Sequence, residues 1–310
     1  MTTAQDQLQP PGQFITIEGH QLHYVDLPPA GAPTTPRTPV LMVHGKAGSV
    51  FDYLLSPLFP NINKDRRVIV IDRMGCGFSR QADDVTLTLV DHARIVQALL
   101  DKLDVWRPIL IGHSMGSAVA LAHALANKTA AKGYLLLAPI AFGARGLDAA
   151  KPMMSQPPVA NFVNRTLLFN GKLVNHGWVW LAFAPNQRCI PDGYTERAVR
   201  LGLDPCQLGA DLRNLLTVNA SLLEMAPRYG EIEQPVIILA GDRDLLSNVM
   251  LQAEPLAESL PHAQLMVLPK TGHMVHFAHP ELVLNAVERI DLGVLPTPAL
   301  RQSPFSALGS

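Results

Sequence analysis

The 310-residue sequence predicts an α/β fold, in which a mostly parallel sheet has helices on both faces and an inserted helical cap. Short unbroken apolar runs, typical of strands buried on both faces, alternate with segments whose apolar residues recur at helical spacing. This alternation stops and later resumes, and between the two parts only helical patterns broken by proline and glycine occur. We therefore predict a core of residues 1–141 and 229–294, a helical cap of residues 142–228, and a loose tail of residues 295–310.

The predicted elements follow the chain in order. A hairpin is expected first, and the buried strands of the sheet are expected at 40–43, 67–72, 109–111, 133–138, 235–240 and 264–268. The hairpin strands are 14–17 and 22–26. The core helices are expected at 53–58, 89–103, after residue 114, within 249–260 and at 281–290. The cap helices are expected at 159–169, 173–183, 194–201 and 208–224. Thr86 or Thr88 is the expected cap of the helix at 89–103.

Composition narrows the class of protein. With 48% hydrophobic residues, 16% charged residues and a net charge of −1, the chain lacks the basic surface expected of a nucleic-acid or anionic-membrane partner. No apolar run approaches the roughly 18 residues of a spanning helix, and the first ten residues do not resemble a signal peptide. We expect a cytoplasmic protein with a small-molecule substrate, and the sequence leaves the oligomeric state open.

One stretch, Gly112-His-Ser-Met-Gly116, lies between a predicted strand and a predicted helix. A G-x-S-x-G pattern in this context is typical of a strained turn that presents a serine. The two glycines would let strand and helix approach closely, and Ser114 would expose its hydroxyl at the apex, with the amide of Met115 on the same side. The alternative is an ordinary tight turn with a surface serine.

A serine nucleophile requires a base and a carboxylate that orients the base. The loop after the predicted strand at 235–240 contains Asp242 and Asp244, and the loop after the last predicted strand contains His273. The order serine, acid, histidine is that of one known class of serine hydrolases. Spacing alone does not decide between Asp242 and Asp244.

Five motifs in one order resemble the α/β-hydrolase superfamily, in its capped, esterase-like branch, over roughly residues 14 to 290. They are His44-Gly45 with Gly48-Ser49, Asp72-Arg-Met-Gly-Cys-Gly-Phe-Ser79, Gly112-His-Ser-Met-Gly116, Gly241-Asp-Arg-Asp244 and Gly272-His273. The resemblance favours Asp244 as the acid and implies that the cap is a lid over the active site. It also implies an oxyanion hole formed by the backbone amides of Lys46 and Met115.

Several residues near these motifs have two interpretations. The Lys46 side chain is expected to turn to solvent, although it could attract an acidic substrate group. His276 and His279 follow His273 closely, but no carboxylate or thiol completes a metal site, so we predict no metal and no cofactor. Trp178 and Phe183 could bind an apolar part of the substrate or form the core of the cap.

These observations predict a serine hydrolase that cleaves a small, largely apolar carboxylic ester through an acyl-enzyme on Ser114. A carbon–carbon bond hydrolase, an amidase or lactonase, and a perhydrolase would use the same residues. A receptor that uses the fold as a ligand pocket without catalysis is the alternative from another class.

Overall fold

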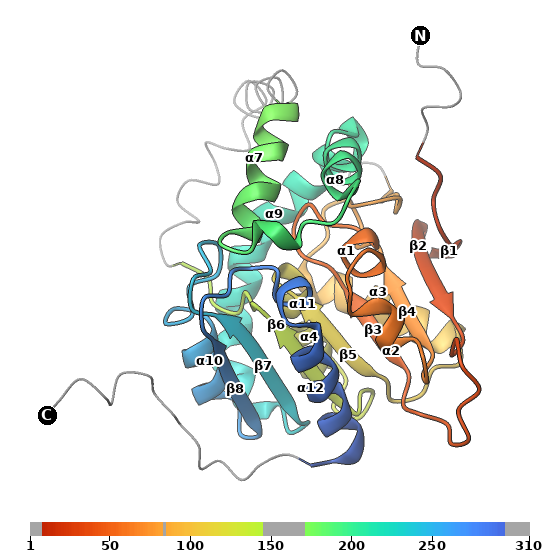
Figure 1. Ribbon diagram of the computed structural model, residues 1–310, viewed down its shortest axis with the longest axis vertical. Coiled ribbons are helices and arrows are strands. Elements are labelled where there is room, and N and C mark those ends of the chain that lie inside the picture. Colours follow the sequence, from red (N-terminus) through yellow and green to blue (C-terminus); the bar gives the residue numbers. More distant parts are fainter. Residues whose placement is uncertain (1–7, 83–84, 145–170, 295–310) are drawn as a thin grey trace, which may run out of the picture.

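The computed structural model describes residues 8–82, 85–144 and 171–294 (Figure 1). The predicted helix at 159–169 and the predicted tail at 295–310 lie outside these residues.

A single eight-stranded sheet forms the centre of the molecule, with the strand order β1-β2-β4-β3-β5-β6-β7-β8. Strands β1 and β2 form the predicted hairpin and β2 pairs antiparallel with β4, whereas all the other neighbours are parallel. The bounds are β1 (Gln13–Ile17), β2 (His20–Leu27), β3 (Val40–Val43), β4 (Val68–Ile71), β5 (Ile109–His113), β6 (Gly133–Leu137), β7 (Val236–Gly241) and β8 (Ala263–Leu268). The mostly parallel sheet predicted from the sequence is confirmed.

Helices cover both faces of this sheet, which explains why its central strands are apolar without alternation. Within β3, Leu41 and Val43 pack into one hydrophobic cluster, and Val40 and Met42 pack into another on the opposite face. The first cluster includes residues of α3 (Leu89–Lys102), α4 (Met115–Ala126) and α10 (Ala253–Ser259). The second includes residues of α1 (Phe51–Leu54), α2 (Phe59–Ile62), α11 (Val275–Ala278) and α12 (Pro280–Leu292).

Local signals account for the start of α3 and for the break between α1 and α2. Thr88, rather than Thr86, caps α3: its hydroxyl accepts the amide of Asp91, and the Asp91 carboxylate accepts the amide of Thr88, which forms a capping box. The single helix predicted at 53–58 is wrong. Helix α1 ends at Leu54 and α2 begins only at Phe59, because Pro57 lacks an amide proton and interrupts the helical hydrogen bonds between them.

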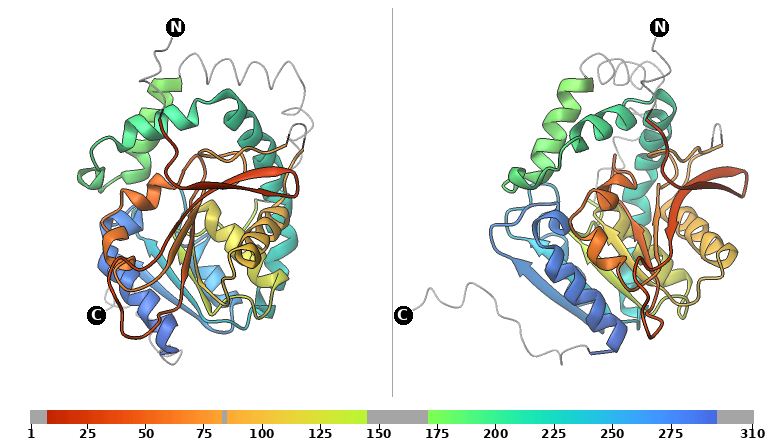
Figure 2. Two further views of the ribbon diagram at one scale, coloured as in Figure 1. Left: turned by 90° about the vertical axis from the view of Figure 1, so that its right-hand side faces the viewer. Right: turned by 45° about the vertical axis from the view of Figure 1, so that its right-hand side comes forward.

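The residues between β6 and β7 form α7 (Gly171–Phe183), the 3-10 helix η3 (Gln187–Cys189), α8 (Tyr194–Gly202), α9 (Pro205–Met225) and the 3-10 helix η4 (Ala226–Glu231). Figures 1 and 2 show α7, α8 and α9 at one end of the sheet. Their contacts reach loops that follow parallel strands. Tyr194 donates to Asp52 after β3, Asn214 donates to the Met74 carbonyl after β4, and Asn186 accepts the amide of Gly272 after β8. In open α/β sheets, this is the edge at which ligands bind.

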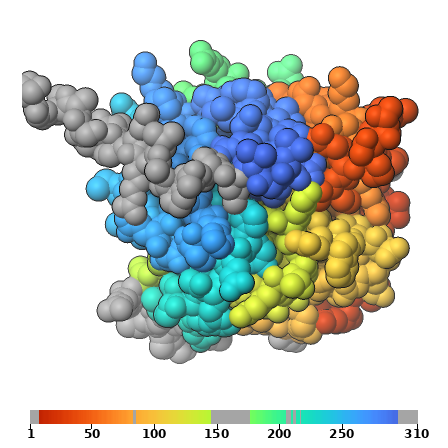
Figure 3. All heavy atoms as spheres, turned by 90° about the horizontal axis from the view of Figure 1, so that it is seen from below, coloured from red at the N-terminus to blue at the C-terminus, as the bar shows by residue number. Residues whose placement is uncertain are grey.

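At the opposite end of the molecule, the C-terminal helix packs beside segments from the start of the chain (Figure 3). Asp291 of α12 accepts hydrogen bonds from Thr38 and Lys132, and Arg66 forms an ion pair with Glu288. These contacts fasten α12 to the segments that precede β3, β4 and β6.

Candidate active site

Ser114 stands at the sharp turn between β5 and α4, with φ 51° and ψ −116°. A positive φ is unfavourable for a residue with a Cβ atom, so this turn is strained. The flanking glycines make it possible. A Cβ atom at Gly112 would lie 2.4 Å from the Gly116 carbonyl oxygen, and one at Gly116 would lie 2.1 Å from the Val43 carbonyl oxygen. The predicted need for both glycines is therefore confirmed.

The sequence predicts an exposed Ser114, and this expectation is wrong, because Ser114 is only 7% exposed. A neighbouring loop covers it: a Cβ atom added to Gly45 would lie 3.1 Å from the Cβ atom of Ser114. The serine thus lies below the surface, next to the loop that follows β3.

His273 and Asp244 are in direct contact, since His273 Nδ1 lies 2.7 Å from Asp244 Oδ2. A carboxylate accepts this bond, so Nδ1 carries the proton and Nε2 is left as the basic nitrogen. The other Asp244 oxygen accepts the amides of Leu246 and Ser247 at 2.8 and 2.9 Å. Both side chains are buried, and this arrangement holds the imidazole in one tautomer and orientation.

Asp242, the acid that spacing could not exclude, takes another position. Its Oδ1 accepts the Thr271 amide at 3.3 Å and its Oδ2 lies 3.9 Å from Arg243 Nε. The Asp242 side chain is 36% exposed and makes no hydrogen bond to His273. Of the two candidates, the structure brings only Asp244 to the histidine.

Ser114 and His273 come from neighbouring loops, but no hydrogen bond within 3.5 Å joins their side chains in the part of the chain that the structure describes. The residue before the serine provides the link: His113 Nε2 donates to the His273 carbonyl at 3.0 Å, and the two rings are 4.7 Å apart. Catalytic hydrogen bonds often shorten only when substrate binds, so the absence of this bond is compatible with a serine–histidine pair.

Two further buried imidazoles surround His273. The rings of His113 and His276 are 4.9 Å apart, and His276 Nε2 donates to the Asp52 carbonyl at 3.1 Å. Burial lowers the pKa of His113 well below its usual value and lowers the pKa of His276 to about 3. Both rings are therefore neutral at pH 7. No group of metal-binding side chains occurs among the described residues.

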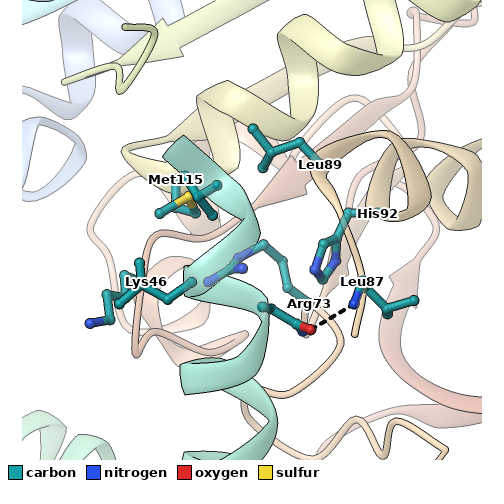
Figure 4. Close-up of a pocket in the computed structure, with 9 residues that line it drawn as sticks. Lys46, Arg73, Leu87, Leu89, His92 and Met115 are labelled. Carbon is teal, nitrogen blue, oxygen red and sulfur yellow. Dashed lines mark hydrogen bonds between the residues drawn. The ribbon is translucent and has the colours of Figure 1, made fainter. Parts of the chain in front are cut away.

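A pocket of about 280 Å³, which includes space open to solvent, lies next to the turn (Figure 4). It is lined by Lys46, Arg73, Leu87, Leu89, His92, Met115, Asn214, Leu215 and Val218. In Figure 4, Arg73 lies between Lys46 and Met115 on one side and His92 and Leu87 on the other. The lining is mostly apolar, and α9 contributes its last three members.

The two predicted oxyanion donors, the amides of Lys46 and Met115, belong to residues that line this pocket. Within the described residues, neither amide has a hydrogen-bond acceptor. Met115 is also the first residue of α4, where the helix dipole favours negative charge. Both amides can therefore donate to a bound anion.

Trp178 and Phe183, which the sequence suggested for substrate binding, do not line this pocket. Trp178 is 42% exposed on α7. Phe183 is buried, and its ring packs against Phe277 and Tyr194 at 4.9 and 5.3 Å. Phe183 thus joins the helices between β6 and β7 to α11, and its role in substrate binding stays a prediction.

Sequence reasoning missed seven of the nine pocket residues, among them Arg73 and Asn214. Arg73 belongs to the D-x-x-G-x-G-x-S segment, so that motif was the available signal. Asn214 had none. It lies within α9, and its side chain accepts the Leu87 amide at 2.9 Å and donates to Gln81 at 2.8 Å. These bonds hold α9 against the segment before α3.

The buried imidazoles predict a loss of stability in acid. Burial lowers the pKa of His92 and of His276 to about 3, so the unfolded chain takes up protons first as the pH falls below about 6.5. Each such group lowers the free energy of unfolding by about 1.4 kcal/mol per pH unit in this window. Burial raises the pKa of Asp52 to about 7, which acts in the opposite direction between about pH 4 and 7 but counts as a single group.

We therefore expect the urea midpoint to fall between pH 7 and pH 4.5. The His92→Gln variant should show a shallower dependence, and the exposed His262→Gln variant should match the wild type. A midpoint that is constant over this range would contradict the prediction.

The fold and site define an enzyme of the hydrolase type, and comparison with known proteins agrees. Residues 38–280 match the family described as alpha/beta hydrolase fold. The chain is 27% identical, over 78% of its length and 82% of the relative's, to 2-hydroxymuconate semialdehyde hydrolase of Pseudomonas sp. (strain CF600). The chain belongs to the α/β-hydrolase fold family.

Two other known proteins are similar to this chain over most of its length. The chain is 28% identical to the dihydrolipoyllysine-residue acetyltransferase component of the acetoin cleaving system of Pseudomonas putida, over 90% of this chain and 69% of that one. Among solved structures, the epoxide hydrolase CorEH shares the fold with a TM-score of 0.75 and 18% identity, over 91% of this chain and 99% of that one.

Among the described residues, no helix combines the length and the apolar character that a membrane span requires.

Proposed function

We propose that the protein is a serine hydrolase that cleaves small, largely apolar carboxylic esters through an acyl-enzyme on Ser114. The observation that carries the proposal is the 2.7 Å contact between His273 and Asp244, on loops beside the strained turn that holds Ser114. A tight surface turn without catalytic function would not require a buried histidine oriented by a buried carboxylate.

In the proposed reaction, His273 Nε2 takes the proton of Ser114 as Oγ attacks the ester carbonyl carbon. The amides of Lys46 and Met115 bind the oxyanion of the tetrahedral intermediate. His273 then donates its proton to the departing alkoxide, and the acyl group stays on Ser114. Water, deprotonated by His273, attacks this acyl-enzyme, releases the acid and restores the serine. Asp244 stabilises the imidazolium in both steps.

The pocket supports the proposed substrate class. Its apolar members, Leu87, Leu89, Met115, Leu215 and Val218, favour a hydrocarbon acyl or alkyl group. We also propose that α7, α8 and α9 act as the lid, because Asn214, Leu215 and Val218 of α9 line this pocket.

A second candidate is hydrolysis of a carbon–carbon bond next to an aldehyde or ketone carbonyl. It is favoured by the similarity to 2-hydroxymuconate semialdehyde hydrolase, which extends over 78% of this chain. Water would add to the carbonyl carbon, and cleavage of the adjacent carbon–carbon bond would yield a carboxylic acid and a protonated carbon fragment. Incubating the protein with 2-hydroxymuconate semialdehyde and measuring the loss of that compound's absorbance would test this reaction directly.

The ester hydrolase proposal is tested with p-nitrophenyl esters of increasing acyl length. We expect a pre-steady-state burst of p-nitrophenol close to one equivalent per enzyme, the highest kcat/KM on short to medium acyl chains, and labelling of Ser114 by a fluorophosphonate probe. Binding of these esters without turnover and without labelling would instead indicate a ligand receptor. Rapid turnover of the semialdehyde with negligible ester cleavage would favour the second candidate.

A further inference from the structure

The peptide unit between Gly45 and Lys46 is held in place by hydrogen bonds to its carbonyl oxygen. Gly45 O accepts three hydrogen bonds, from Arg73 Nη2 at 2.9 Å, from His44 Nδ1 at 2.7 Å and from the Gly48 amide at 3.4 Å. A trans peptide is planar, with its C=O and N–H pointing in opposite directions. Donors that fasten Gly45 O therefore direct the Lys46 N–H to the other side, and Lys46 lines the pocket.

The tautomer of His44 follows from its contacts. The Arg73 backbone amide donates to His44 Nε2 at 3.0 Å, so Nε2 accepts and Nδ1 must carry the proton. That proton is the one donated to Gly45 O. Burial, and next the Arg73 charge, lower the pKa of His44 well below its usual value, which keeps the ring neutral and this tautomer in place.

Arg73 donates hydrogen bonds to two successive backbone carbonyls of the same loop. Its Nε donates to His44 O at 3.1 Å while its Nη2 donates to Gly45 O, and Nη2 also lies 3.4 Å from Cys76 Sγ. The residue is 5% exposed, and no carboxylate lies within 4 Å of its guanidinium in the described part of the chain. A planar guanidinium can contact both carbonyls at once, whereas a lysine ammonium presents a single point of contact.

We infer that Arg73 and His44 are positioning residues for the reaction. They hold the Gly45–Lys46 peptide so that the Lys46 amide points at the developing oxyanion. The inference rests on the proposed function, because it assigns these residues to the oxyanion hole of that same site. Neither side chain takes part in proton transfer or in covalent bonding.

Paired histidine variants separate this role from simple packing. Asn reproduces the position of Nδ1, so His44→Asn keeps a donor to Gly45 O, whereas Gln reproduces Nε2 and His44→Gln loses that donor. Loss of one oxyanion donor costs about 10²–10³ in kcat. We expect His44→Gln to lower kcat on a p-nitrophenyl ester by about 10²-fold with KM little changed, and His44→Asn to recover most of that loss.

Variants of Arg73 and Arg67 provide a second test of the inference. Arg73→Lys should lower kcat by about 10- to 100-fold and weaken a boronic-acid analogue of the tetrahedral intermediate by a similar factor. Arg67→Lys is the matched control. Arg67 also donates both to a carbonyl, that of Leu103, and to the carboxylate of Asp26, but it lies outside the site. The Arg67→Lys variant should have a lower free energy of unfolding, with no change in kcat or in the affinity for the boronic-acid analogue.

The outcomes are distinct. Wild-type kcat and analogue affinity in folded Arg73→Lys and His44→Gln would overturn the inference while the hydrolase proposal stands. An equal loss in His44→Asn and His44→Gln would also overturn it, since only one of them removes the donor. Absence of ester turnover and fluorophosphonate labelling in the wild-type protein would overturn the proposed function itself.

Discussion

Replacing Ser114 by alanine is expected to abolish ester hydrolysis, with a loss in kcat of about 10⁶-fold, as in other serine hydrolases. Without Oγ, no acyl-enzyme can form, and only slow attack by water beside the oxyanion hole remains. Stability should change by less than about 0.5 kcal/mol, because alanine has the same Cβ atom and therefore the same strain at φ 51°. Rates on a p-nitrophenyl ester, fluorophosphonate labelling and urea unfolding measure these effects.

Ser117 supplies the matched control for this prediction. It lies one turn along the same segment, and its buried hydroxyl donates to Gly112 O at 2.7 Å. Ser117→Ala should lower the free energy of unfolding by roughly 1 kcal/mol. Ser114 of this variant should still be labelled by the fluorophosphonate probe. If Ser114→Ala retained most of the activity, Ser114 would not be the nucleophile.

Asp244→Asn is expected to lower kcat by about 10⁴-fold. An asparagine amide that faces His273 Nδ1 donates a proton where the carboxylate accepted one, which moves the imidazole proton to Nε2. The ring can then no longer act as a base toward Ser114. Steady-state kinetics with the same ester, at pH 7 to 9, measure the loss.

Asp242→Asn is the control, because Asp242 lies in the same loop and contacts the Thr271 amide rather than His273. Its kcat should stay within about threefold of the wild-type value, as expected for a partly exposed side chain outside the site. A large loss in Asp242→Asn together with an active Asp244→Asn would exchange the roles of the two residues.

The framework of the fold was predictable because its determinants are local. Continuous apolar runs predicted the core strands to within one or two residues, and Thr88, one of two threonines proposed as the cap, marks the start of α3. The error at residues 53–58 shows the limit of periodicity. An apolar pattern was present there, but Pro57 prevented a continuous helix.

The candidate site was predictable only in part. The order of Ser114, an acid and His273 was visible, and the family resemblance favoured Asp244. Spacing alone did not decide between the two aspartates, because that choice depends on which carboxylate faces the ring. Likewise, Asn214 reaches the pocket from a helix more than 120 residues beyond the Leu87 amide that it contacts. No local pattern encodes such a contact, because it arises from the way α9 packs on the core.

By itself, the sequence determined the order of strands and helices, the glycine-flanked turn at Ser114 and the set of candidate catalytic residues. These properties follow from side-chain periodicity and from the space that each residue occupies within its own segment. Only the tertiary structure decided the burial of Ser114, the hydrogen bond between His273 and Asp244 that the family resemblance had favoured, and the hydrogen bonds from Arg73 to the His44 and Gly45 carbonyls. Each of these depends on contacts between separate loops, which are set when the sheet aligns its strand ends.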